Sequence, residues 1–145
     1  MDSIFRLLHR AEQNAKIVFG ARGLPSGMTQ RQFDVLVAVE NNPGASQTTL
    51  TEKTMIDRST LSNIVFILDK KNLLKRARTE DDKRAYGIVL TEKGRSMLSV
   101  MHPIAEVANG ALLGTIPDPV RDAFLDALER LAKIQLSDYT GQRQS

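Results

Sequence analysis

Cysteine is absent from the 145-residue sequence, and histidine occurs only twice, at His9 and His102. The lack of cysteine excludes disulfides, thiolate zinc sites and thiol-based redox sensing. Two histidines are too few for a dense metal site, so we predict neither a metal nor a cofactor. No segment approaches the roughly 18 consecutive apolar residues that a membrane span needs. The N-terminus also lacks a signal-peptide apolar block, so we expect a cytoplasmic protein without a membrane partner.

Two common catalytic signatures are also missing. The sequence has no Gly-x-Ser-x-Gly nucleophile pattern and no Gly-x-x-x-x-Gly-Lys phosphate loop. A small enzyme is therefore the weaker of the alternatives, and we predict that the chain is not an enzyme. Its length, with 41% hydrophobic residues, fits a single domain over residues 1–145.

The net charge of +3 is unevenly distributed. Residues 1–57 carry six basic and six acidic side chains, residues 58–95 carry ten and five, and residues 96–145 carry four and six. A local basic block is typical of a phosphate-binding face. A solvated surface with no ligand would give the same count, so charge alone leaves both interpretations open.

Apolar periodicity and capping residues divide the chain into helices and one hairpin. Thr29 with Gln32 forms a capping box, and Ser46, Asp57 and Thr91 are further helix caps. Pro103 falls within one helical pattern, where we expect a kink and not a break. The predicted helices cover about 3–19, 29–41, 47–54, 58–71, 92–113 and 117–137, and the predicted strands cover 73–78 and 85–90.

This order, ααααββαα, describes a mainly α protein with a small β-hairpin wing, in the α+β class. The short turn between the third and fourth helices has helix-turn-helix spacing, so residues 29–95 are predicted to form a winged helix-turn-helix. The helices at about 3–20 and 92–137 carry more apolar surface than this small unit can cover. We expect them to form a dimerisation region.

The start of the fourth helix holds candidate DNA-binding residues. N-terminal residues of a recognition helix reach base edges in the major groove, and the short polar side chains here are poor helix formers for an exposed face. The alternative is that Asp57 and Ser59 only cap the helix. Candidates in the helix-turn-helix are Thr48, Arg58, Ser59, Thr60, Ser62 and Asn63.

The hairpin adds cations that can lie along the minor groove or the phosphate backbone. The candidates are Arg76, Arg78, Lys83 and Arg84, beside Lys75. Asp82 is an acid within this basic loop, and we infer that it orients Arg84 or another wing cation. A simple turn role for Asp81 and Asp82 is the alternative.

The runs Asp57-Arg58-Ser59-Thr60-Leu61-Ser62, Asp81-Asp82-Lys83-Arg84-Ala85 and Leu90-Thr91-Glu92-Lys93-Gly94 resemble the MarR family of regulators. That family has an Asp-x-Arg in the wing, followed by Leu-Thr-x-x-Gly. The resemblance extends over nearly the whole chain in element order. It implies a homodimer on double-stranded DNA with an inverted-repeat operator, in which Arg84 reaches the minor groove and Asp82 orients it.

The resemblance also implies a ligand-responsive regulator, commonly a repressor that leaves DNA when a small anionic, often aromatic, effector binds. Because the family has no fixed pocket motif, effector-binding candidates are chosen by position: His9, Gln13, Lys16, Arg31, Met97 and Met101. A solvated or core histidine is the alternative for His9. A winged-helix protein-interaction module and a ligand-independent DNA-binding regulator are the competing functions.

Overall fold

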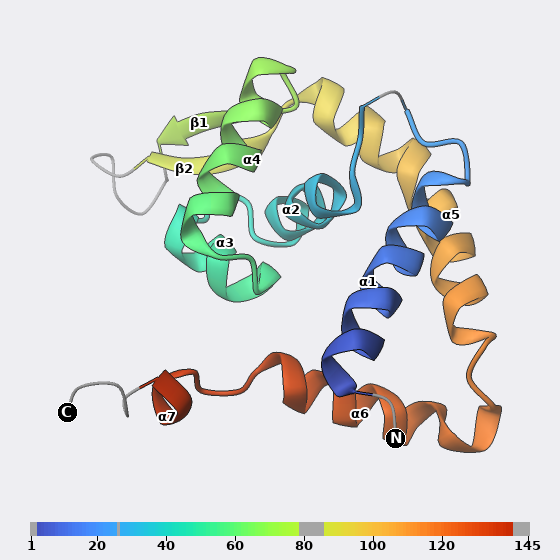
Figure 1. Ribbon diagram of the computed structural model, residues 1–145. Coiled ribbons are helices and arrows are strands. Elements are labelled where there is room, and N and C mark those ends of the chain that lie inside the picture. The colour runs from blue at the N-terminus through green and yellow to red at the C-terminus, as the bar shows by residue number, and fades with distance from the viewer. Residues whose placement is uncertain (1–2, 26, 79–85, 141–145) are drawn as a thin grey trace. The chain divides into compact units, whose positions relative to one another are not determined.

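The computed structural model describes residues 3–25, 27–78 and 86–140 (Figure 1). Its elements are α1 (Ile4–Gly20), α2 (Gln30–Asn41), α3 (Gln47–Thr54), α4 (Arg58–Lys70), β1 (Leu74–Arg78), β2 (Tyr86–Leu90), α5 (Glu92–Leu113), a 3-10 turn (Asp118–Val120), α6 (Arg121–Ala132) and α7 (Ser137–Thr140). The predicted fold class and element order are confirmed. Residues 1–112 and 113–145 form two compact units.

The C-terminal unit differs from the prediction of one helix over 117–137. Helix α6 ends at Ala132, where the backbone N–H of Lys133 bonds back to the carbonyls of Glu129 and Arg130. The additional helix α7 is a single turn that begins where the predicted helix ends. Periodicity cannot predict so short a turn, because four residues do not complete an apolar stripe.

Helix α2 lies at the centre of the N-terminal unit. The capping box is present, since Gln32 N donates to Thr29 Oγ1 at 3.2 Å and Thr29 N donates to Gln32 Oε1 at 3.3 Å. Because α2 has neighbours on more than one side, Val35 and Leu36 are both fully buried. The fully buried core side chains are Val35, Leu36, Val39, Leu50, Leu61, Leu68, Leu73, Leu74, Leu98 and Met101.

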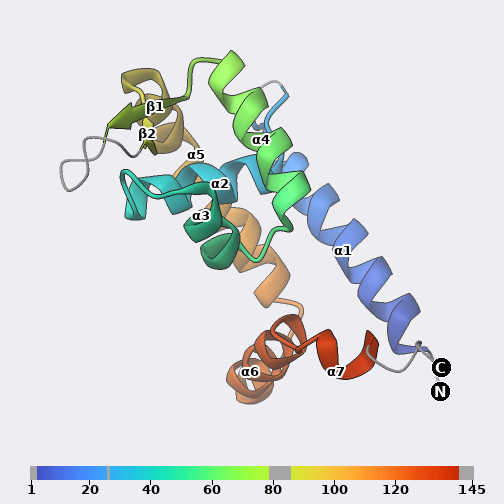
Figure 2. The same cartoon turned by 90° about the vertical axis from the view of Figure 1, so that its left-hand side faces the viewer.

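The hairpin is antiparallel and pairs Leu74 with Leu90 at its base and Arg78 with Tyr86 at its far end. It is attached to the loop after α2 by two backbone bonds of 2.9 Å, between Gly44 and Ile88 and between Ile88 and Ala45. Gly87 is required at this contact, since a Cβ there would lie 2.0 Å from the Gly44 carbonyl oxygen. The wing is therefore held at a fixed place beside α2 (Figure 2).

Helix α5 begins against the segment that joins α4 to β1. Thr91 donates its backbone N–H to the Leu73 carbonyl at 3.1 Å and its hydroxyl to the Asn72 carbonyl at 2.7 Å. The same hydroxyl oxygen accepts the N–H of Gly94 at 2.9 Å, as a helix cap does. Helix α5 then continues through Pro103 without interruption. No helix among the described residues is long and apolar enough to cross a membrane.

The close approach of α5 to Leu73 explains why a glycine, Gly94, stands three residues after Thr91. A Cβ at Gly94 would lie 2.1 Å from the Leu73 carbonyl oxygen, whereas one at Gly110, in the same helix, meets nothing within 4 Å. We predict that Gly94→Ala lowers the free energy of unfolding by about 1–3 kcal/mol, the typical cost of overpacking. Gly110→Ala should be neutral or stabilising, because alanine favours helix.

Urea denaturation followed by circular dichroism measures both variants. Equal stabilities for Gly94→Ala and Gly110→Ala would contradict the close approach of α5 to Leu73.

Candidate nucleic-acid interface

Helices α3 and α4 form the predicted helix-turn-helix. Ser46 Oγ caps α3 by accepting from Thr49 N at 3.1 Å, and Asp57 Oδ1 caps α4 by accepting from Thr60 N at 2.9 Å. Between them, Met55 adopts a left-handed backbone with φ of 56°. The fully buried Leu50 and Leu61 fix the two helices to the core. Hydrogen bonds from Thr60 hold the pKa of Asp57 below its ordinary value, so the cap is ionised at neutral pH.

The start of α4 presents most of its predicted residues to solvent. Arg58, Ser59, Ser62 and Asn63 are exposed, and Thr60 is half-buried beside the Asp57 cap. Thr48 is exposed on the first turn of α3. Their contact with DNA stays a prediction, but the two helices bring these side chains within one helix-turn-helix.

Gln47 is a member of this surface that sequence reasoning missed. Its side-chain oxygen accepts a hydrogen bond of 2.9 Å from the hydroxyl of Ser62, which joins the start of α3 to α4. The two residues are 15 positions apart and on separate helices. The only signal in the sequence was the place of Gln47 immediately after the Ser46 cap.

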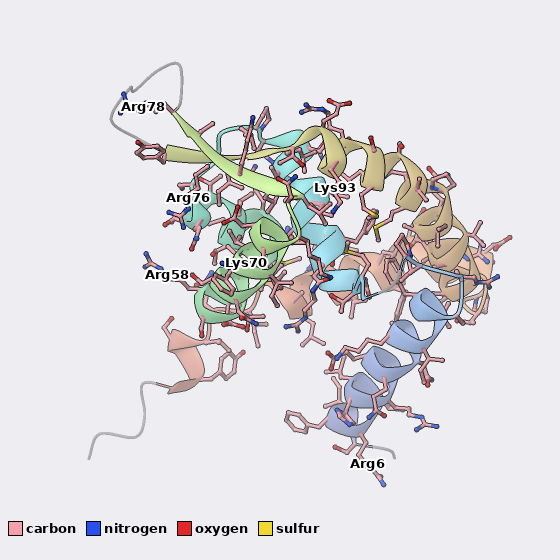
Figure 3. The ribbon with its side chains drawn as sticks, turned by 90° about the horizontal axis from the view of Figure 1, so that it is seen from above. Arg6, Arg58, Lys70, Arg76, Arg78 and Lys93 are labelled. Atoms are coloured by element: carbon pink, nitrogen blue, oxygen red, sulfur yellow. The ribbon has the colours of Figure 1, made fainter. Side chains whose placement is uncertain are left out.

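Strand β1 adds two cations to the same side of the molecule. Arg76 and Arg78 are exposed, and the Arg78 guanidinium lies 5.8 Å from the centre of the Tyr86 ring. Figure 3 shows Arg58, Arg76 and Arg78 along one edge of the unit, with Arg6 of α1 well away from them. The predicted wing residues Asp82, Lys83 and Arg84 lie outside the described residues.

A shallow cleft of about 230 Å³ separates α4 from β1. Ser62, Phe66 and Asp69 line it from α4, and Lys75 and Arg76 line it from β1. Lys70 lies 5.4 Å from the centre of the exposed Phe66 ring. Five basic side chains therefore make this face cationic, which suits a polyanionic backbone. They are Arg58, Lys70, Lys75, Arg76 and Arg78.

Comparison with known proteins identifies this arrangement. Residues 26–85, which span the helix-turn-helix and much of the hairpin, match the model of the MarR family. The solved structure of BpsR from Bordetella bronchiseptica superimposes with a TM-score of 0.83 at 26% identity, covering 92% of this chain and 96% of BpsR. The winged helix-turn-helix of the chain therefore matches the MarR family, and the chain resembles a solved MarR-family regulator over nine tenths of its length. Its fold and its relatives are those of DNA-binding transcriptional regulators.

Two further MarR-family proteins are similar over most of the chain. The transcriptional repressor NicR of Pseudomonas putida is 27% identical over 130 residues, which are 90% of this chain and 82% of NicR. The repressor CouR has been solved bound to a 23-mer DNA duplex, with a TM-score of 0.77, 27% identity and coverage of 90% of this chain and 93% of that chain. CouR from Rhodococcus jostii has also been solved with p-coumaroyl-CoA, at 25% identity, a TM-score of 0.78 and coverage of 92% and 94%.

A second site feature is a cavity of about 660 Å³ where the end of α1 meets the start of α2. Its apolar lining includes Phe19, Leu24 and Met28. Lys16 and Arg31, two of the predicted effector-binding residues, provide positive charge. Such a size and mixture of side chains is typical of small-molecule sites.

Two acids also line this cavity. Glu12 accepts from Lys16 Nζ at 2.8 Å and lies 4.0 Å from Arg31, and the hydrogen bond from Lys16 lowers the pKa of Glu12. Burial raises the pKa of Asp34 above its ordinary value, and Arg31 partly offsets this rise. Sequence reasoning missed Asp34, because it interrupts the apolar pattern of α2 like any surface acid.

The other predicted effector residues lie elsewhere in the unit. His9 and Gln13 are exposed on α1, Met97 packs partly buried against the core, and Met101 is fully buried. None of these four lines the cavity between α1 and α2. Their role stays a prediction. The described residues contain no group of acids and histidines that could hold a metal ion.

The raised pKa of Asp34 predicts a pH-dependent stability. The unfolded chain loses this proton near pH 3.9 and the folded chain at higher pH, so ionised Asp34 costs stability above that range. We therefore expect Asp34→Asn to be more stable than the parent at pH 7, with the advantage disappearing toward about pH 3.5.

Urea denaturation over this pH range measures the difference. A gain for Asp34→Asn that is the same at every pH would show that packing, and not ionisation, is the cause.

Proposed function

We propose that the protein is a repressor that binds a pseudo-palindromic operator as a homodimer and is released by a small aromatic acid. DNA binding is supported above all by the exposed Arg58 of α4 and Arg76 and Arg78 of β1, which lie along one edge of the unit (Figure 3). A recognition helix in the major groove with a wing beside it uses such a face. The DNA complex of CouR and the repressor NicR support the operator and the repressor role.

Homodimer formation is supported by exposed apolar side chains in each unit separately. On α1, the side chains of Phe5 and Ile17 are 80% and 67% exposed. On and beside α6, no residue is buried, and exposed apolar residues recur at helical spacing. These are Val120, Phe124, Leu125, Leu128, Ile134 and Leu136. A second copy of the chain would cover both surfaces and set two recognition helices on two half-sites, about one helical turn apart.

The cavity between α1 and α2 supports an anionic aromatic effector. Lys16 and Arg31 can bind a carboxylate, and Phe19 and Met28 offer apolar surface to a ring. The DNA binding of BpsR is regulated by 6-hydroxynicotinic acid, which has this chemistry. Arg31 also lies within electrostatic reach of Asp57, the cap of α4. A ligand that binds Arg31 would therefore change the field at the start of the recognition helix.

The operator contact is tested by Arg58→Ala and Arg76→Ala. We predict that each substitution weakens DNA binding by about 5-fold or more. Where the lost contact is to phosphate, the salt dependence should decrease by about one unit of slope per contact, or about two per dimer. Fluorescence anisotropy with a footprinted upstream operator, at several salt concentrations, measures both quantities.

Arg6→Ala is the matched control, with the dimer verified by analytical ultracentrifugation. If neither Arg58→Ala nor Arg76→Ala changes DNA affinity, α4 is a protein-interaction surface and the proposal is wrong.

The effector site is tested with benzoate and 6-hydroxynicotinate. We predict that both raise the melting temperature and release operator DNA, and that Lys16→Gln or Arg31→Gln weakens binding by about 10-fold, the cost of losing a charged hydrogen bond. Arg22→Gln, just after α1, is the control. Calorimetry and gel shifts provide the readouts. A parent protein that binds its operator and responds to no aromatic acid would be a ligand-independent regulator.

A further inference from the structure

Asp34 is the only member of the cavity's four charged side chains for which the described residues provide no direct partner. Glu12 bonds to Lys16 and lies near Arg31, which accounts for the other three. The carboxylate of Asp34 makes no hydrogen bond or ion pair within the described part of the chain. Arg31 acts on it only through its field. The cavity therefore contains a half-buried carboxylate to which no described residue donates a hydrogen bond.

The position of Asp34 makes it accessible from the apolar part of the site. Besides the cavity between α1 and α2, it lines a smaller one of about 210 Å³ bounded by α1, α2 and α5. The two cavities share Ala15, Phe19, Gln30 and Asp34. A ring placed against Phe19 would consequently have Asp34 beside it, whichever cavity it occupies.

A half-buried carboxylate without donors distinguishes between ligands. A ligand hydroxyl or N–H would donate to it and form a charge-assisted hydrogen bond. A ligand that has only a carboxylate would leave this acceptor unsatisfied and place a second negative charge near it. Sites built to hydrogen-bond a ligand hydroxyl reject analogues that lack it, because the polar group of the site is then left unpaired.

We propose that Asp34 makes the effector site selective for aromatic acids that carry, besides the anionic group, a hydroxyl or N–H hydrogen-bond donor. The anionic group binds Lys16 and Arg31, and the donor binds the Asp34 carboxylate. This assignment rests on the proposed effector function and adds a residue that sets its specificity. The preferred ligand class is narrower than aromatic acids in general, since methylation of the donor removes the bond to Asp34 and weakens binding.

Matched pairs of probes test the selectivity. The pairs are 3-hydroxybenzoate with 3-methoxybenzoate and 4-hydroxybenzoate with 4-methoxybenzoate, and benzoate is the reference without a substituent. Calorimetric titration of the parent protein should show at least one hydroxy compound binding about 10-fold or more tightly than its methoxy partner, as expected for a hydrogen bond to a charged group.

Asp34→Asn then identifies the group responsible. In this variant the preference for the hydroxy compound should decrease to about threefold or less, since a neutral amide forms a weaker bond. Benzoate should bind the variant at least as tightly as it binds the parent, because a negative charge has been removed from its site. Glu40→Gln, an acid on the same helix outside both cavities, should keep the parent's preference.

Three results would overturn the proposal. If the parent binds each hydroxy and methoxy pair equally, or if Asp34→Asn keeps the preference, the aromatic-acid site stands and the role of Asp34 is wrong. If none of the five probes binds the parent, the proposed effector class fails, and the assignment of Asp34 fails with it.

Discussion

The carbonyl of Leu73 is the point on which the arrangement of the N-terminal unit depends. It accepts the backbone N–H of Thr91, and Gly94 lies so close to it that a Cβ has no room. The adjacent Asn72, with φ of 58°, ends the α4 segment and accepts the Thr91 hydroxyl. One short junction thus fixes the end of α4, the base of the hairpin and the start of α5 relative to one another.

This junction gives a rigid body of the kind that DNA recognition needs. The hairpin is held at its base by Leu73 and Thr91 and along its length by the Gly44 and Ala45 contacts with Ile88. The backbone segments that carry the cations of α4 and β1 are therefore joined to each other through hydrogen bonds. A backbone that is already in place loses less entropy when it binds a partner.

The elements that local chemistry specifies could be predicted from the sequence. Thr29, Ser46, Asp57 and Thr91 cap helices as expected, because each bonds a backbone N–H three residues away. The change from helical to alternating periodicity likewise located the hairpin. Boundaries were less accurate at the C-terminal end, where the 3-10 turn and α7 divide what periodicity indicated as a single helix.

Features that depend on distant residues could not be predicted. The full burial of Val35 and Leu98 is an example, because it depends on the neighbours that α2 and α5 have on more than one side. The place of Asp34 in a cavity is another, because residues of α1, which lies elsewhere in the sequence, form the other side of that cavity. Lys16 and Arg31 were predicted from position and do line one cavity, whereas the roles of His9, Gln13 and both methionines stay predictions.

The bond between Gln47 and Ser62 has a consequence for the hydrogen-bonding groups that the start of α4 offers to a partner. Because the Ser62 proton is directed to Gln47, the serine oxygen offers only lone pairs outward, while the amide nitrogen of Gln47 keeps its two N–H groups. In the major groove, lone pairs complement the exocyclic amino groups of adenine and cytosine, and N–H groups complement N7 and O6 of guanine. This pair would therefore present an acceptor beside a donor, in a set order, to any base edge that α4 reaches.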